Sequence, residues 1–361
     1  MQATLKRLEQ LVVADTSAIT REEWLELRRQ GIGGSDAAAV LGISPFKTMR
    51  DLYYEKLGIA PAEPDESNWV QLEIGHLLED LVARIFQEKT GLPIYPVKKM
   101  YRHPVHSFML ATPDYFTEDK DGPAVVEIKT TNYFAKDNWW YDSRETVPLY
   151  YESQGGHYMP VVDMNRTYYC CLYGNSIDDV IIRLIDRDMD YENELIFHEQ
   201  NIWNNNVLKK IPPPYTETGN LVLESVKRHH GLAVPTAPGI LLDDGYETEI
   251  EQYLALQAEK SKWDRGSKAI ENQMKLIKGR IADKMGKSCM ASYFNGETAY
   301  EVSYKPAPRT DINKDNLLKL KMQYPDIYEK FITISENRRF SIKSVAAEKE
   351  SAGFSEERKA A

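Results

Sequence analysis

The residues best suited to chemistry lie in the segment 107–131, which combines two carboxylates and a lysine with strand-forming apolar residues. The polar residues 118–122 predict a turn, so the segment has the pattern of two strands joined as a hairpin. Side chains alternate along a strand, which puts Glu127 and Lys129 on one face. Closing the hairpin brings Asp114 opposite or diagonal to Glu127 on that face. The spacing therefore gathers two acids and one ammonium in an otherwise apolar sheet.

Burying such a cluster is costly unless something offsets its charge. A divalent cation does so, because Mg²⁺ prefers hard oxygen ligands and is usually held by one or two carboxylates together with substrate phosphate. For an isolated Glu-x-Lys, an ordinary ion pair on a solvated sheet face is the simpler interpretation. The additional acid at Asp114 favours a metal site. Two cations bridged by carboxylates suit phosphodiester hydrolysis, and Lys129 can then act as base or electrostatic stabiliser.

A long helix is expected at residues 69–90, closed by a glycine at position 91. Glu79 lies at the edge of its predicted apolar stripe, where it can reach solvent or aim at the sheet. Gly75, one turn earlier, leaves room for close approach. The stripe is expected to comprise Ile74, Leu77, Leu78, Leu81, Val82 and Ile85.

A glycine-rich turn, residues 31–36, separates two predicted helices near the N-terminus. The first of these helices opens on a capping box and runs from residue 20 to 29. Ser35 or Asp36 is expected to be the N-cap of the second, at 37–41. Free backbone N–H groups at such a turn can hold an anion, although a tight interhelical turn explains the pattern equally well.

The remaining elements give the fold class. Helices are expected at 3–13, 48–58, 133–141, 149–162 and 188–209, and strands at 93–103, 166–173 and 180–186. This order predicts an α/β or α+β fold with a central mixed sheet flanked by helices. Cys170 and Cys171 fall in a predicted strand, so at least one is expected to be a core residue, and no metal-binding cysteine spacing is present.

The C-terminal part has a different pattern. We expect a nuclease-type domain at 1–210, a linker at 211–246, a module at 247–347 and a disordered tail at 348–361. The module combines a long helix with a small α+β unit, including a hairpin at Asn295-Gly296 and a strand at 339–343. Residues 260–287 carry nine Lys or Arg against three acids, which is either a DNA-gripping strip or a solvated helix face.

The composition of the chain limits the class of protein and its location. The 361 residues carry a net charge of −10, with 42% hydrophobic and 28% charged residues, as in ordinary globular proteins. No apolar run is long enough to span a bilayer and no signal-peptide pattern begins the chain, so we expect no membrane association and a cytoplasmic location. Residues 285–288 are similar to the end of a nucleotide-binding loop, but Ile281 replaces its first glycine, so no ATP requirement is expected.

The chain resembles the YqaJ-type viral recombinases, relatives of the lambda-type exonucleases in the PD-(D/E)xK nuclease superfamily. The resemblance spans about residues 24–209. Five motifs in the family's order carry it: Trp24 with Leu27-Arg28-Arg29, Gly31-Ile-Gly-Gly-Ser-Asp36, Gly75-His-Leu-Leu-Glu79, Pro113-Asp114 with Glu127-Ile-Lys129-Thr-Thr, and Gln154-Gly-Gly-His-Tyr158. Two positions depart from it: Tyr115 stands where many relatives have Gly, and Ile74 where many have Trp.

The resemblance implies roles for individual residues. Asp114, Glu127 and Glu79 would bind metal with the carbonyl of Ile128, and Lys129 would position or deprotonate the attacking water. Gln154 would be a catalytic residue, with support from Thr130, His157 and Tyr158. Arg28 and Ser35 would hold a 5′-phosphate. The implied cofactor is Mg²⁺ or Mn²⁺, with two ions, and the implied assembly is a homotrimer.

The expected protein is an ATP-independent 5′→3′ exonuclease that acts on double-stranded DNA. It would deliver the resulting single-stranded DNA to a single-strand annealing partner in phage recombination. The alternatives are an endonuclease on the same core, acting in defence or genome processing, and a non-catalytic DNA-binding protein. The complete set of Asp114, Glu127 and Lys129 argues against the last.

Overall fold

The computed structural model describes residues 1–61, 69–230, 247–285, 290–294, 299–303, 312 and 314–332. The chain divides into two compact units, Met1–Gly231 and Leu232–Ala361. The candidate site lies in the first unit. Within the described residues, no helix is long and apolar enough to cross a membrane.

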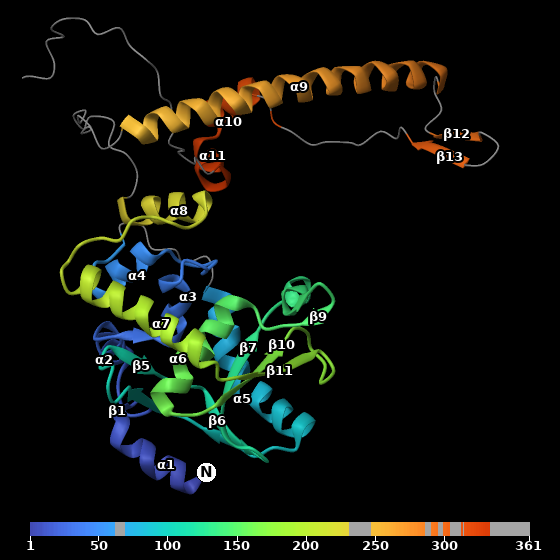
Figure 1. The fold of residues 1–361 in the computed structure, drawn as a ribbon. Coiled ribbons are helices and arrows are strands. Elements are labelled where there is room, and N and C mark those ends of the chain that lie inside the picture. The colour runs from blue at the N-terminus through green and yellow to red at the C-terminus, as the bar shows by residue number, and fades with distance from the viewer. Residues whose placement is uncertain are drawn as a thin grey trace, which may run out of the picture. The chain divides into compact units, whose positions relative to one another are not determined.

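A five-stranded mixed sheet forms the centre of the first unit (Figure 1). Its order is β11-β10-β7-β6-β3, and β7 runs parallel to β10 and antiparallel to β6. Residues 124–128 of β7 are buried, because the strand is covered on both faces. The strands are β3 (Ile94–Pro96), β6 (Tyr115–Asp119), β7 (Gly122–Thr130), β10 (Arg166–Leu172) and β11 (Val180–Asp186).

Two helices cover the faces of this sheet. On one face, α5 (Trp69–Thr90) packs Val82 and Phe86 against Val126 of β7. On the other, α6 (Leu149–Val162) packs Val161 into a cluster that includes Val125. The fold class, α+β with a central mixed sheet flanked by helices, is confirmed.

The bounds of α5 and α6 match the prediction, but the predicted stripe on α5 is only partly correct. Ile74, Leu77 and Leu81 are exposed, since the buried face turns through Val82, Ala83 and Phe86 instead. Glu79 belongs to this inward face and is half-buried. Both cysteines of β10 are buried, as expected.

A second sheet has the strand order β1-β4-β5-β2, and α1 and α3 lie on different sides of it in Figure 1. Its strands are β1 (Val12–Asp15), β2 (Ile32–Gly33), β4 (Lys99–Arg102) and β5 (Met109–Ala111). The helices are α1 (Gln2–Leu8), followed by the 3₁₀ turn Glu9–Leu11, then α2 (Arg21–Arg29), α3 (Gly34–Val40) and α4 (Met49–Lys56).

Three predicted elements in or beside this second sheet differ from the structure. The helix expected at 3–13 ends at Leu8, because the β-branched pair Val12-Val13 enters β1. The single strand expected at 93–103 is two strands in different sheets, β3 and β4. The helix expected at 37–41 begins at Gly34 with Gly33 at its N-cap, so neither Ser35 nor Asp36 is the N-cap.

Two further helices differ in type from the prediction. Residues 133–141 form a 3₁₀ helix, Tyr133–Trp139, followed by the small hairpin of β8 (Trp140–Tyr141) and β9 (Arg144–Glu145). Residues 188–209 begin as α7 (Met189–Ile202) and continue as a π-helical turn, Trp203–Val207.

The segment expected to be a linker contains a packed helix, α8 (Gly219–His230). Its Ser225 and His229 each lie within 2.9 Å of an oxygen of Asp51 on α4, and Arg228 lies 3.3 Å from it. These contacts make α8 part of the first unit, which extends past residue 210 for that reason. Residues 231–246 fall outside the described part of the chain.

The second unit contains the expected elements where it is described. They are α9 (Glu247–Met285), the antiparallel pair β12 (Met290–Phe294) and β13 (Ala299–Ser303), α10 (Lys314–Gln323) and α11 (Pro325–Phe331). The predicted turn at Asn295-Gly296, the predicted strand at 339–343 and the tail at 348–361 lie outside the described residues.

Candidate active site

Asp114 and Glu127 meet where β6 begins beside β7. The register pairs Tyr115 with Val126, so Asp114 comes next to Glu127 on the adjoining strand. A carboxylate oxygen of Asp114 accepts the backbone N–H of Ile128 at 2.8 Å. The ammonium of Lys129 lies 2.5 Å from Glu127 Oε1. The hairpin geometry expected from the alternation is therefore present.

Helix α6 contributes two polar side chains to this cluster from the same helical face. The amide of Gln154 donates to Glu127 Oε1 and to the hydroxyl of Tyr158, and its Oε1 accepts from Lys129 at 3.0 Å. Tyr158 donates to the carbonyl of Thr112. Glu127 is thus fixed from two sides, by its own strand and by the helix over it.

Burial makes this an unfavourable place for negative charge. Burial together with Asp114 raises the pKa of Glu127 to about 8, and partial burial together with the same neighbour raises the pKa of Glu79 to about 7. Burial favours the neutral amine of Lys129, yet Glu127 and Asp114 outweigh it and hold its pKa above the usual value. The cluster has more acids than cations to pair with them.

The donor set suits a hard divalent cation. Glu127 Oε2 is buried and accepts no hydrogen bond from the described residues, so an oxygen ligand remains free. Among those residues, no three His, Cys, Asp or Glu side chains stand close enough to form a complete cage. Mg²⁺ does not require one, because it keeps several waters and uses one or two carboxylates with substrate oxygens.

The three residues expected to support the site have different positions. Tyr158 contacts the cluster through Gln154. Thr130 lies beneath α5, where its hydroxyl would be 3.7 Å from a Cβ at Gly75. His157 is buried away from the carboxylates, between Glu199 at 2.7 Å and the carbonyl of Leu110 at 2.9 Å. His157 therefore links α6 to α7 and β5.

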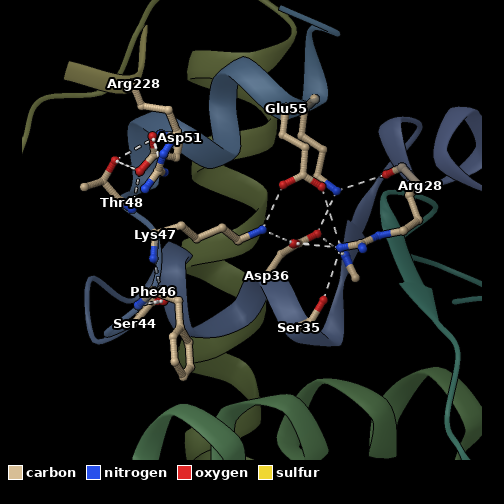
Figure 2. Close-up of polar contacts among 12 residues, drawn as sticks. Arg28, Ser35, Asp36, Ser44, Phe46, Lys47, Thr48, Asp51, Glu55 and Arg228 are labelled. Atoms are coloured by element: carbon tan, nitrogen blue, oxygen red, sulfur yellow. Dashed lines mark hydrogen bonds and ion pairs between the residues drawn. The ribbon is translucent and has the colours of Figure 1, made fainter. Parts of the chain in front are cut away.

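A second charged cluster, drawn in Figure 2, surrounds the buried carboxylate of Asp36 on α3. Its Oδ1 accepts from Arg28 at 3.1 Å and from Lys47 at 2.7 Å, and its Oδ2 accepts from Lys56 at 2.6 Å. These cations, Lys47 first among them, hold the pKa of Asp36 well below its usual range despite its burial. We call Arg28, Asp36, Lys47, Glu55 and Lys56 the Asp36 cluster.

Arg28 and Ser35, the predicted phosphate ligands, are brought together at the edge of this cluster. Arg28 donates to Ser35 Oγ at 3.1 Å and its guanidinium lies 4.9 Å from the centre of the Trp24 ring. Arg28 is therefore held in place rather than free on the surface. The N–H of Gly33 is already taken by Asp36, at 3.0 Å.

Sequence reasoning missed Lys47, Lys56 and Glu55, and with them the role of Asp36. Lys47 precedes α4 and the other two belong to it, so no local spacing connects them with the glycine-rich turn. The available signal was Asp36 itself, an acid directly before the three alanines and the valine that complete the helix. Such a residue needs cationic partners when buried.

The two clusters are joined by a close helix contact. A Cβ at Gly34 of α3 would lie 2.4 Å from the ring of Tyr158 on α6. Real Cβ atoms do not approach so closely, so glycine is required for α3 to reach α6 at this point.

The pair Pro113-Asp114 with Glu127-Ile128-Lys129, set on adjoining strands of a helix-flanked mixed sheet, defines a protein with a PD-(D/E)xK-type core. The YqaJ-like viral recombinase domain matches residues 23–165. The chain is also 32% identical over 346 residues to "Uncharacterized protein YqaJ" of Bacillus subtilis (strain 168), covering 95% of this chain and 100% of that protein. The chain belongs to the YqaJ-like viral recombinase family.

Solved structures similar to this chain include an alkaline exonuclease, LHK-Exo, from Laribacter hongkongensis. It is 16% identical with a TM-score of 0.42, and the match covers 57% of this chain and 98% of that one. A phage-related exonuclease from Haemophilus somnus 129PT is 13% identical with a TM-score of 0.40, covering 52% and 99%.

Proposed function

We propose that the protein is a metal-dependent, ATP-independent exonuclease that degrades linear double-stranded DNA in the 5′→3′ direction. Family membership supports a role in phage-type recombination. The observation that carries the proposal is the half-buried Asp114 beside the buried Glu127, with Lys129 and a Glu127 oxygen that has no hydrogen-bond partner among the described residues. These groups are those that phosphodiester hydrolysis requires.

Asp114 and Glu127 would hold the metal together with the main-chain carbonyl of Ile128, and Glu79 would join them by a movement of its half-buried side chain. When bound there, one or two Mg²⁺ or Mn²⁺ ions would supply positive charge at the scissile phosphate and a lower pKa for the attacking water. Lys129, kept in place by Glu127 and Gln154, orients that water and stabilises the charge that develops on the phosphate.

The end of the duplex would be recognised by the side chains of Arg28 and Ser35. An Arg guanidinium presents a planar set of donors that fits a phosphate, and Ser35 adds an exposed hydroxyl beside it. A terminal phosphate carries nearly two negative charges, whereas an internal phosphodiester carries one. This difference favours ends over internal positions.

The test is a digestion series on end-labelled DNA. We expect 5′-phosphorylated linear duplex to be degraded much faster than 5′-hydroxyl duplex, closed circles to resist, and omission of ATP to leave the rate unchanged. Arg28→Ala and Ser35→Ala should lose most of the preference for phosphorylated ends and keep the metal site. Equal rates on all three substrates would instead support the alternative, an endonuclease built on the same core.

The same proposal includes the partners that the family resemblance implies. These are a single-strand annealing recombinase that takes up the exposed 3′ strand, and a homotrimer that encloses DNA. A cytoplasmic location in a bacterial host follows from such a role.

A further inference from the structure

Glu55 occupies the outer side of the Asp36 cluster, facing two cations that already share Asp36. Its Oε2 accepts from Lys47 at 2.9 Å, and its Oε1 lies 3.7 Å from Arg28 (Figure 2). Its side chain is 37% exposed, against 21% for Arg28 and 22% for Lys47. The carboxylate of Glu55 is therefore the most accessible group of the cluster.

The two oxygens of Glu55 bridge Arg28 and Lys47 as two oxygens of a phosphate would. Arg and Lys both bind carboxylate and phosphate through the same N–H donors. Asp36 cannot be displaced in the same way, because it is fully buried and also holds Lys56 and the N–H of Gly33. Glu55 is the anion of this cluster that another anion can replace.

Charge counting supports such an exchange. Arg28, Lys47 and Lys56 carry three positive charges, and Asp36 and Glu55 together offset two. If Glu55 turns into solvent, the cluster retains two positive charges, which match a terminal phosphate dianion. A phosphodiester with one charge gains less from the same exchange.

We propose that Glu55 is an internal competitor for the 5′-terminal phosphate, and that Lys47 becomes a phosphate ligand when Glu55 is displaced. This inference rests on the proposed function of Arg28 and Ser35 in binding the end. It adds that Glu55 sets the selectivity of the Asp36 cluster for anions, because only a dianion competes well with a carboxylate already in place.

The test measures binding without hydrolysis, using the full-length protein in chelator and short duplexes with 5′-phosphate or 5′-hydroxyl ends, by fluorescence anisotropy. The readout is the ratio of the two affinities, which cancels the general effect of charge on DNA binding. Glu55→Gln should tighten binding of the phosphorylated duplex by about twofold to fivefold, from the usual strength of partly exposed ion pairs, with little change for the hydroxyl duplex. Lys47→Met should lower the ratio.

Glu26→Gln is the matched control, because Glu26 is an exposed acid that pairs with Arg29 on the same helix as Arg28. It should leave the ratio unchanged. The double variant Glu55→Gln/Lys47→Met should lose the gain seen for Glu55→Gln, since the competition acts through Lys47. If Glu55→Gln folds poorly, Glu55→Asp, which keeps the charge but shortens its reach, should raise the ratio by a smaller factor.

An unchanged or lower ratio in Glu55→Gln, with the wild type favouring phosphorylated ends, overturns this inference and leaves end recognition by Arg28 and Ser35 intact. A ratio of one in the wild type and in Glu55→Gln overturns both this inference and end recognition by Arg28 and Ser35. A ratio of one in the wild type that rises in Glu55→Gln supports Glu55 as the competitor.

Discussion

Replacing Glu127 by Gln separates the chemistry of the site from its packing. The two side chains have the same shape, and the amide oxygen can still accept from Lys129 and Gln154, which both contact Glu127 Oε1. The variant loses the negative charge and the oxygen Oε2 that is free to bind a metal. Hydrolysis should therefore fail while the fold is retained.

The size of the effect follows from what each interaction contributes. Loss of a preorganised electrostatic group at a reaction centre typically costs about 10²–10³-fold in rate, or more. A metal present at about 100 times its dissociation constant stabilises the folded protein by about 2.7 kcal/mol. For a unit of this size, Met1–Gly231, this corresponds to about 5–10 °C in melting temperature.

Two measurements check this prediction. Release of nucleotides from labelled duplex gives the rate, and thermal unfolding with Mg²⁺ or with chelator gives the metal-dependent shift. The wild type should show the shift and Glu127→Gln should lose it, whereas Glu26→Gln should behave as wild type. A variant that keeps more than about a tenth of the wild-type rate, or the full thermal shift, would refute the assignment of Glu127 as a metal ligand.

Three further outcomes are expected. Lys129→Ala should lower the rate of hydrolysis by about 10²–10³-fold or more in Mg²⁺ or Mn²⁺, with far-UV circular dichroism unchanged. Ca²⁺ should bind the wild type without comparable turnover. Full activity of the variant, or of the wild type in chelator, would contradict the roles proposed for Lys129 and the metal. Asp36→Asn should destabilise the protein by about 3–5 kcal/mol in denaturant unfolding, because buried cations lose their shared carboxylate; a change below about 1 kcal/mol would mean that the cluster is not a stabilising network. Burial disfavours the charged form of His157, but Glu199 outweighs this and raises its pKa above 6.5, so its charged form stabilises the fold below pH 6.5 and this contribution is lost as pH rises through the raised pKa. The stability difference between wild type and His157→Gln should accordingly be largest below pH 6.5 and shrink at higher pH, and a difference that grows with pH would contradict the pairing.

The elements predicted correctly carry their signals in neighbouring residues. Helix α5 ends at Thr90 and is followed by Gly91, which adopts the left-handed backbone conformation that suits glycine, with φ +69°. The strands β6 and β7 show both the turn and the alternation, and these alone place Asp114 beside Glu127. An element can be predicted from sequence alone when one short segment contains both the residues that begin and end it and the spacing of its apolar residues.

The elements that were missed depend on contacts between distant segments. Lys47 reaches Asp36 and Ser225 reaches Asp51 only after the chain has folded. Part of the exposed side of α5 was included in its predicted core stripe, because Leu77 and Leu81 satisfy helical spacing as well as Val82 does. Periodicity defines a stripe but does not show which residues at its edges are covered.

The contact between Gly34 and Tyr158 has a consequence for the distance between the two candidate sites. The side chains proposed to bind the DNA end belong to α2 and α3, and those proposed for hydrolysis to β7 and α6, so this contact between α3 and α6 helps to set the distance between the two candidate sites. With the proposed roles, the length of DNA between the held end and the cut bond would be set by the protein scaffold and would not depend on base sequence. A larger side chain at position 34 would force α3 and α6 apart. The distance between the two candidate sites would then increase, and a different phosphodiester bond would be presented for cleavage.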